Sequence, residues 1–369
     1  MKLRNWSIAL LALGLIFFIV FLFPLKADIV NGGSNFLGES GFKKLLRWKP
    51  SSDYVPGEIA LGKVFQEDHS WTKKLTNGRT RVLITTGDVM LGRAVNQKTA
   101  QKGDFIWPFQ NTADFLKSAD LTFINLESPI VENCPVKIDG MTFCGNTRHV
   151  EGLLFSGIDV ANLANNHIGN YGTEGLNTTS NFLESVGILT TGNLKPAYKE
   201  SGGMVFSFLG YNDIPPKFEG VSWVDEERVE REIKEAKANS DIVIVAFHWG
   251  EEYRRFPTKR QKKLARLAID LGASVVVGNH PHAIQPIEVY KGGLIVYSHG
   301  NFVFDQMWSE GTKEGIVGRF VFYDEKLVDA EFFPIRIENY GQPYLLTDQR
   351  KDEILEELEK DSRILAEGE

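Results

Sequence analysis

Apolar and polar positions alternate from Arg81 onward in blocks that predict β-strands separated by α-helices. Short apolar runs of strand length recur, with longer segments between them whose apolar residues lie three or four positions apart. We expect strands at residues 81–88, 120–127, 159–167, 187–193, 204–212, 241–250, 274–280 and 294–302. Strands that alternate with helices in this way predict an α/β sandwich with mixed sheets.

Three segments show the periodicity of amphipathic helices. Residues 259–271 follow Pro257 and end at Gly272, which are favoured residues at the two ends of a helix. Residues 226–238 have the same pattern, and so do residues 352–365, which are strongly acidic. We expect the acidic helix to pack on the surface of the domain, and docking of a partner protein is its alternative role.

The N-terminus contains an uncharged apolar run of 19 residues from Ser7 to Leu25, preceded by Lys2 and Arg4. The run is close to the ~20 residues that cross the core of a bilayer. It lacks the small-residue cleavage site of a signal peptide, so we expect an uncleaved anchor rather than a cleaved leader or a buried helix. The positive charges hold the N-terminus in the cytoplasm, which places the chain after Lys26 outside the cell membrane.

These patterns divide the chain into four parts. We expect a membrane anchor in residues 1–26, a membrane-proximal spacer in residues 27–77, the α/β domain in residues 78–345 and an acidic C-terminal helix in residues 346–369. Residues 27–77 are assigned to a spacer because they mix glycine, proline, charged and aromatic residues without sustained periodicity.

Composition and charge restrict the function. With 43% hydrophobic and 24% charged residues, the chain is typical of globular proteins rather than disordered ones. Its net charge is −7, and residues 351–369 hold eight acids against three bases, which leaves the rest of the chain nearly neutral. Because nucleic-acid binding requires a basic face, we expect no nucleic-acid partner.

Cys134 and Cys144 lie in a loop interrupted by proline and glycine. In the oxidising environment outside the membrane, a local disulfide between them is the natural arrangement. Two free thiols in a cytosolic protein are the alternative. A metal site built on the pair is the least favoured reading, because no neighbouring cysteine or histidine completes a ligand set.

Five of the expected strands end in side chains that bind metals. These are Asp88, Glu127, Asn166 with His167, His248, and His280 with His282. One histidine after a strand is more often structural, but ligands of open α/β sheets bind beyond the carboxyl ends of the strands, and five coincidences favour a shared site. Carboxylates, imidazoles and an amide oxygen without a thiolate suit manganese, zinc or iron.

Six motifs occur in order between Arg81 and Pro343: GDVMLGR, NLESP, ANNH, HWGEEY, GNHPH and SHGNFVFDQ. Together they resemble the CapA/PgsA family of poly-γ-glutamate biosynthesis proteins, a branch of the calcineurin-like metallophosphoesterase superfamily. The resemblance implies a four-layer α/β/β/α sandwich that holds one or two divalent transition metals between the sheet edges.

The resemblance also implies a role for each strand-end residue. One metal would be bound by Asp88 and His282, a second by Asn166, His248 and His280, with Glu127 bridging them and His167 acting as general acid. The sequence departs from the superfamily at Met90, where a histidine ligand is usual. A thioether is a poor ligand for a hard cation, so we expect the first metal position to be weak or empty.

Further residues near the motifs complete the expected site. Arg93, Arg254 and Arg255 follow ligand-bearing strands and are candidates for binding an anionic substrate, with solvated loop arginines as the alternative. We expect Glu252, His299 and Asn301 to orient the ligands, with a solvent-facing residue as the alternative for Glu252.

The resemblance implies a membrane-anchored, extracytoplasmic protein of poly-γ-glutamate capsule synthesis, export or anchoring. Its partners would be the anionic polymer, the membrane and the membrane-bound synthase or export subunits, and its chemistry that of a metal-dependent hydrolase or acyl or amide transferase. A phosphoesterase acting on nucleotides or other phosphate esters is one alternative, and a non-catalytic metal-stabilised scaffold is another. Met90 favours the scaffold over the phosphoesterase, whereas His167 favours catalysis.

Overall fold

The computed structural model describes residues 56–368 of the chain. The expected membrane anchor and the first part of the expected spacer lie outside these residues. No helix within residues 56–368 combines the length and the apolar character that are needed to cross a bilayer.

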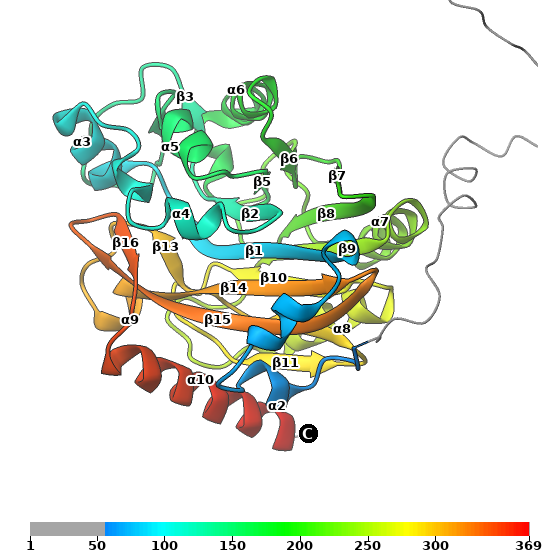
Figure 1. The fold of residues 1–369 in the computed structure, drawn as a ribbon. Helices are drawn as coiled ribbons and strands as arrows, with labels where there is room; N and C mark the ends of the chain where they lie inside the picture. The colour runs from blue at the N-terminus through cyan, green and yellow to red at the C-terminus, as the bar shows by residue number, and fades with distance from the viewer. Residues whose placement is uncertain (1–55, 369) are drawn as a thin grey trace, which may run out of the picture. The chain divides into compact units, whose positions relative to one another are not determined.

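Two mixed β-sheets form the centre of the fold (Figure 1). The larger sheet consists of β1 (Thr80–Val89), β2 (Leu121–Leu126), β5 (Val160–Asn162), β6 (Leu189–Thr191), β13 (Asn301–Val303), β14 (Glu314–Tyr323), β15 (Lys326–Glu338) and β16 (Gln342–Leu345). Its strand order is β16-β15-β14-β1-β2-β5-β6, and β13 pairs with β1. The smaller sheet consists of β7 (Ala197–Ser201), β8 (Met204–Asn212), β9 (Ile242–His248), β10 (Val275–Asn279), β11 (Ile287–Tyr290) and β12 (Gly293–Val296), in the order β11-β12-β10-β9-β8-β7.

Helices cover the outer face of each sheet. The larger sheet is covered by α3 (Arg93–Lys102), α4 (Ala113–Leu116), α5 (His149–Phe155) and α6 (Gly172–Ser185). The smaller sheet is covered by α7 (Glu226–Asn239) and α8 (Lys259–Asp270). The remaining helical segments are α2 (Leu61–Val64), η1 (Ser70–Lys74), η2 (Asn77–Arg79), η3 (Trp107–Phe109), η4 (Ile168–Tyr171), α9 (Glu310–Lys313) and α10 (Gln349–Glu367), and a short ribbon pairs β3 (Ile130–Val131) with β4 (Gly145–Asn146).

Alternation of side chains along the strands produces these layers. In β1, Leu83 points into the apolar core shared by the two sheets, and the next residue, Ile84, packs with the helices on the outer face. In β9, Ile244 belongs to the shared core, whereas Val243 packs with α7 and α8. Both faces of each sheet are therefore buried, and the layers run helices, sheet, sheet, helices.

The structure confirms the three helices expected from periodicity. The helix expected at 259–271 is α8, which begins with a capping box between Thr258 and Gln261. The helix expected at 226–238 is α7, whose first turn is capped by Asp225. The acidic C-terminal helix is α10, which packs against β11 and β15 with Ile354 and Leu358 in the shared core.

The prediction of one strand at residues 294–302 is wrong. The chain leaves the smaller sheet after Val296 and joins the larger sheet at Asn301, where β13 pairs with β1. Gly300, with φ of +71°, lies in the crossing, and a Cβ at Gly87 would come within 2.3 Å of the Gly300 carbonyl oxygen. This close approach brings the crossing against β1, next to Asp88.

The part of the expected spacer that the structure describes packs onto the domain. Residues 56–79 form α2, η1 and η2, and Val64 belongs to the core shared by the sheets. His69 Nδ1 lies 2.8 Å from Asp329 Oδ2 in β15, and both side chains are buried.

Candidate metal centre

The carboxyl ends of parallel strands from both sheets meet at one place. β1, β2 and β5 run parallel in the larger sheet, and β8, β9 and β10 run parallel in the smaller one. Asn125 at the end of β2 links the sheets, because its Nδ2 donates to Asp88 Oδ1 at 2.8 Å and lies 3.3 Å from His248 Nδ1. The strand-end residues that the sequence singled out therefore share one junction.

Asp88, Glu127 and His282 offer ligand atoms that all lie within 4.8 Å of one another. His282 Nδ1 is 3.2 Å from Asp88 Oδ2, and His282 Nε2 is 3.8 Å from Glu127 Oε1. All three side chains are buried. Two carboxylates and an imidazole at this separation can share one divalent cation.

The other three expected ligands lie beside this group. His248 Nε2 is 3.8 Å from Glu127 Oε1 and 2.9 Å from Asn166 Oδ1. The ring centroid of His280 is 4.9 Å from that of His248 and 5.8 Å from that of His282. The structure thus brings all six expected ligands together.

The turn that carries His280 and His282 has an unusual backbone. Both residues adopt positive φ values, +95° and +52°, which non-glycine residues rarely do and which cost of order 1–3 kcal/mol each. The His280 N–H donates to Asp88 Oδ2 at 3.2 Å, and the Pro281 carbonyl accepts from the Tyr253 N–H at 2.7 Å. These bonds hold both imidazoles at the junction.

Burial controls the protonation of the cluster. It raises the pKa of Glu127 well above its ordinary value, and the neighbouring charge of Asp88 adds to the shift. Burial would also raise the pKa of Asp88, but the hydrogen bond and charge of His282 outweigh it, and the pKa is lowered. Burial lowers the pKa of His280 to about 3 and that of His248 well below its ordinary value. Neutral imidazoles leave nitrogen lone pairs available to a cation.

Unpartnered polar atoms support the presence of a metal. Both carboxylate oxygens of Glu127 and Nδ1 of His280 are buried without a hydrogen-bond partner among residues 56–368. A buried carboxylate without partners costs several kcal/mol, and a bound cation removes that cost. The donors are carboxylate, imidazole and amide oxygens and nitrogens, which fit manganese, zinc or iron.

His167 lies at the edge of the cluster and is buried. Its ring stacks on Phe143 with centroids 3.9 Å apart, and its Nδ1 lies 3.1 Å from Asn170 Oδ1. Burial lowers the pKa of His167 to about 4, and the hydrogen bond to Asn170 only partly offsets it. The imidazole is therefore neutral near pH 7 and is positioned by two separate contacts.

Met90 is turned into the apolar core of the larger sheet. Its Sδ accepts a hydrogen bond from the Gly92 N–H at 3.0 Å, and its side chain is fully buried. Met90 is thus engaged in packing and adds no donor to the cluster.

A network of asparagines behind the ligands was missed by the sequence reasoning. Asn125 Oδ1 accepts from Asn162 Nδ2 at 3.0 Å and from Asn165 Nδ2 at 3.3 Å. Asn165 Oδ1 in turn accepts from the backbone N–H groups of His167 and Ile168, which fixes the turn that bears Asn166. The available signal was an asparagine within each of the apolar strands β2 and β5.

The three residues expected to orient ligands differ in position. Asn301 Oδ1 lies 2.9 Å from His282 Nδ1, and Glu252 offers an oxygen close to His280 and His282. His299 instead bridges the two sheets, with Nε2 2.8 Å from Thr85 Oγ1 and Nδ1 3.4 Å from the Gly278 carbonyl oxygen.

The three expected substrate-binding arginines are not brought together. The Arg93 guanidinium pairs with Asp305 and lies 4.5 Å from the centroid of the Phe143 ring, next to His167. Arg254 is exposed and pairs with Glu251 at 2.9 Å. Arg255 pairs with Asp361 and so contacts α10 rather than the cluster.

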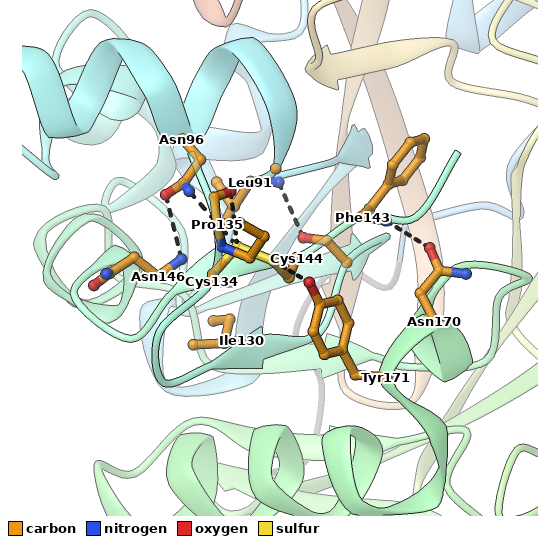
Figure 2. Close-up of a disulfide and its surroundings, with 12 residues drawn as sticks. Leu91, Asn96, Ile130, Cys134, Pro135, Phe143, Cys144, Asn146, Asn170 and Tyr171 are labelled. Carbon is orange, nitrogen blue, oxygen red and sulfur yellow. Dashed lines mark hydrogen bonds between the residues drawn. A yellow bond between two sulfur atoms is a disulfide. The ribbon is translucent and has the colours of Figure 1, made fainter. Parts of the chain in front are cut away.

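A disulfide joins Cys134 to Cys144 near this edge of the site (Figure 2). The Tyr171 hydroxyl lies 3.2 Å from Cys144 Sγ, and the Phe143 N–H donates to Asn170 Oδ1 at 2.7 Å. Phe143, adjacent to the disulfide, is the residue that stacks on His167. The loop closed by the disulfide therefore forms one wall beside His167.

A known protein family matches the part of the chain that builds this junction. The family described as "Bacterial capsule synthesis protein PGA_cap" matches residues 82–306. The chain belongs to the PGA_cap family. The matched residues contain every side chain of the metal centre and end before β14, so the family pattern covers the part of the chain that builds the site.

Curated relatives include other bacterial proteins of this kind. The chain is 35% identical to the PGA biosynthesis protein CapA of Bacillus subtilis, over 72% of this chain and 77% of the relative. It is 31% identical to the capsule biosynthesis protein CapA of Bacillus anthracis, over 80% and 75%. It is 28% identical to a probable polyglutamine synthesis accessory protein of Mycobacterium tuberculosis, over 68% and 76%.

Solved structures match this PGA_cap chain more weakly. A phosphatase from Mycoplasma pneumoniae aligns over 74% of this chain and 96% of its own, with 13% identity and a TM-score of 0.47. A similarity at this level supports no conclusion about activity.

Proposed function

We propose that this PGA_cap protein acts in the synthesis, export or anchoring of a poly-γ-glutamate capsule polymer as a metal-dependent hydrolase or acyl or amide transferase. The names of the relatives from Bacillus subtilis and Bacillus anthracis support the pathway. The observation that carries the chemistry is the buried Glu127 carboxylate, which has no hydrogen-bond partner among the described residues and is faced by His248 and His282. The types of ligand in this cluster resemble those of metallophosphoesterases.

The residues that would hold a divalent cation are Asp88, Glu127, Asn166, His248, His280 and His282. When bound, the cation polarises a carbonyl or phosphoryl oxygen and lowers the pKa of water. His167 is fixed by Phe143 and Asn170 at the edge of this cluster, where it can exchange a proton with a leaving group.

Positive charge near the site suits an anionic polymer. Arg93 is close enough to Glu127 to oppose the rise in the pKa of that carboxyl. The exposed Arg254 lies on the loop after β9 and pairs with Glu251. A chain of free carboxylates would gain charge-assisted hydrogen bonds from these groups.

The proposed location is the outer face of the cell membrane. The uncharged run from Ser7 to Leu25 has the length of a membrane anchor, and the bases before it favour a cytoplasmic N-terminus. The disulfide between Cys134 and Cys144 is typical of proteins outside the cytoplasm.

The test compares two substrate classes with the full chain purified in detergent and loaded with manganese or zinc. We expect turnover of γ-glutamyl oligomers and its loss in Glu127→Gln, while the exposed control Glu151→Gln stays at the wild-type rate. Hydrolysis of p-nitrophenyl phosphate esters without γ-glutamyl turnover would replace the polymer with a phosphate ester as substrate. No turnover of either substrate by metal-loaded protein would overturn the catalytic role.

A further inference from the structure

One position of the metal centre is short of ligands. Asp88, Glu127 and His282 form one group of donors, but Met90, which follows Asp88 in the same motif, contributes nothing. Its sulfur already accepts the Gly92 N–H, and its side chain is packed in the core. A second cation at this junction therefore needs a donor from elsewhere in the chain.

The loop after β9 brings a carboxylate to that place. Gly250 has a φ of +84°, and a Cβ there would lie 2.6 Å from Gln261 Oε1, so the loop turns sharply against the start of α8. The Tyr253 N–H then donates to the Pro281 carbonyl at 2.7 Å. This bond joins the loop to the turn of His280 and His282. Glu252 immediately precedes Tyr253 in the loop.

Glu252 forms a second group of possible ligands. One of its carboxylate oxygens and one nitrogen each of His280 and His282 all lie within 4.8 Å of one another. His280 is only 5% exposed, and its Nδ1 has no hydrogen-bond partner among residues 56–368. The neighbouring Glu251 pairs with Arg254, whereas Glu252 forms no ion pair within residues 56–368.

We propose that Glu252 is a metal ligand that compensates for the donor lost at Met90, so that the centre binds two cations. It would join Asp88, Glu127 and His282 at the position that Met90 leaves short, while His280 serves the adjoining position with Asn166 and His248. His282 belongs to both groups, which makes the two positions neighbours. Carboxylate and imidazole donors suit the same divalent transition metals at both. This inference rests on the metal centre of the proposed function.

The test measures metal content rather than turnover. The full chain in detergent is stripped with a chelator, equilibrated with Mn²⁺ or Zn²⁺, and analysed for bound metal per chain by plasma mass spectrometry. We expect two cations per chain in the wild type, one in Glu252→Gln, and two in the matched control Glu251→Gln, whose residue lies next in sequence and is also exposed. Thermal unfolding in the presence of chelator should be the same for all three proteins, because Glu252 is exposed.

The outcomes separate this inference from the function on which it rests. Wild-type metal content in Glu252→Gln, or a single cation in the wild type, overturns the role of Glu252 and leaves a metal centre in place. A wild-type chain that binds no cation overturns the metal centre itself.

Discussion

At the scale of single residues, Asn301 helps to set which ring nitrogen of His282 carries the proton, together with Asp88, whose Oδ2 lies 3.2 Å from the same Nδ1. Its Nδ2 donates to the Thr312 carbonyl at 2.9 Å and to Gln306 Oε1 at 3.0 Å, which fixes its Oδ1 towards His282 Nδ1. Because an amide oxygen only accepts, the His282 Nδ1 must carry the proton. The lone pair of Nε2 is then directed to the side where Glu127 lies.

Loss of this orientation should weaken metal binding. We expect Asn301→Ala to lower the affinity for Mn²⁺ or Zn²⁺ by ~10–100-fold, the usual effect of removing a partner of a ligating histidine. Competition titration with a fluorescent chelator measures it. Asn193→Ala, which removes hydrogen bonds to Ser180 and Thr190 away from the centre, is the control and should bind as the wild type does. Equal affinities in the two variants would contradict the role of Asn301.

The ligands were easier to predict from the sequence than the residues that hold them in position. Asp88, Glu127, Asn166 and the histidines stand where apolar runs stop, and parallel strands bring such ends together. Asn125 and Asn162 lie inside β2 and β5, where a local pattern assigns them to a buried strand but gives no partner. Arg255, a candidate for substrate binding, pairs with Asp361, which lies more than a hundred residues away in α10 and which no local pattern reveals.

At the scale of elements, the segment closed by the disulfide supports one wall of the site. It presents Phe143 between His167, stacked at 3.9 Å, and the Arg93 guanidinium at 4.5 Å. Asn96 Nδ2 also contacts Cys134 Sγ at 3.6 Å and ties the segment to α3 (Figure 2). The disulfide therefore links stability to the position of His167.

Removal of the disulfide should have two effects. We expect the double variant Cys134→Ser with Cys144→Ser to lose ~2–4 kcal/mol in the free energy of unfolding, since the unfolded chain gains freedom. Urea unfolding measures the loss, and turnover should fall as well because Phe143 no longer holds His167. Wild-type protein treated with a reductant should behave in the same way. An unchanged free energy of unfolding would show that the loop is held by packing alone.

Residues 56–79 are attached to β15 by an ion pair between His69 and Asp329, and the strength of this pair depends on pH. Burial alone would lower the pKa of His69, but the hydrogen bond and charge of Asp329 outweigh it and raise the pKa above 6.5. A raised pKa in the folded state means that protonated His69 stabilises the fold below pH 6.5. That contribution disappears as the pH rises through the folded-state pKa.

Comparison with His69→Gln isolates this contribution. We expect the wild type to exceed the variant in free energy of unfolding by more at pH 6 than at pH 9. Urea unfolding at both pH values gives the difference, and the exposed Lys73→Gln variant serves as control for general charge effects. A difference that stays constant or grows with pH would contradict the raised pKa.

Elements with strong local signals were predictable, whereas one hairpin and one crossing between the sheets were not. The hairpin of β14 and β15 was not among the expected strands, because Pro334 argues against a strand and the turn at Asp324 has no glycine. The crossing from β12 to β13 was read as one strand, because one apolar run is divided between two sheets. Only the contacts of the folded chain distinguish these cases.

At the scale of the whole molecule, the two sheets supply different parts of the centre. Asp88 in β1 and Glu127 after β2 belong to the larger sheet, and His248 at the end of β9 and His280 after β10 belong to the smaller one. A cation at their junction would bind the folded chain and not the unfolded one, and would stabilise the packing of one sheet on the other. The family match covers the strands of both sheets that carry these ligands.

The location of the chain can be tested through its only two cysteines, Cys134 and Cys144. If the apolar run at Ser7–Leu25 carries the domain across the membrane, the two cysteines form their disulfide outside. A variant that lacks residues 2–26 would stay in the cytoplasm, where thiols are kept reduced. We expect the full chain in the membrane fraction to resist alkylation by a maleimide polymer and the truncated chain in the soluble fraction to take up two labels. A Cys134→Ser variant, with one free thiol, provides the single-label standard on the gel. Equal labelling of the full and truncated chains would argue against an extracytoplasmic domain. It would mean that the cysteines are in the same redox environment whether or not the N-terminal run is present.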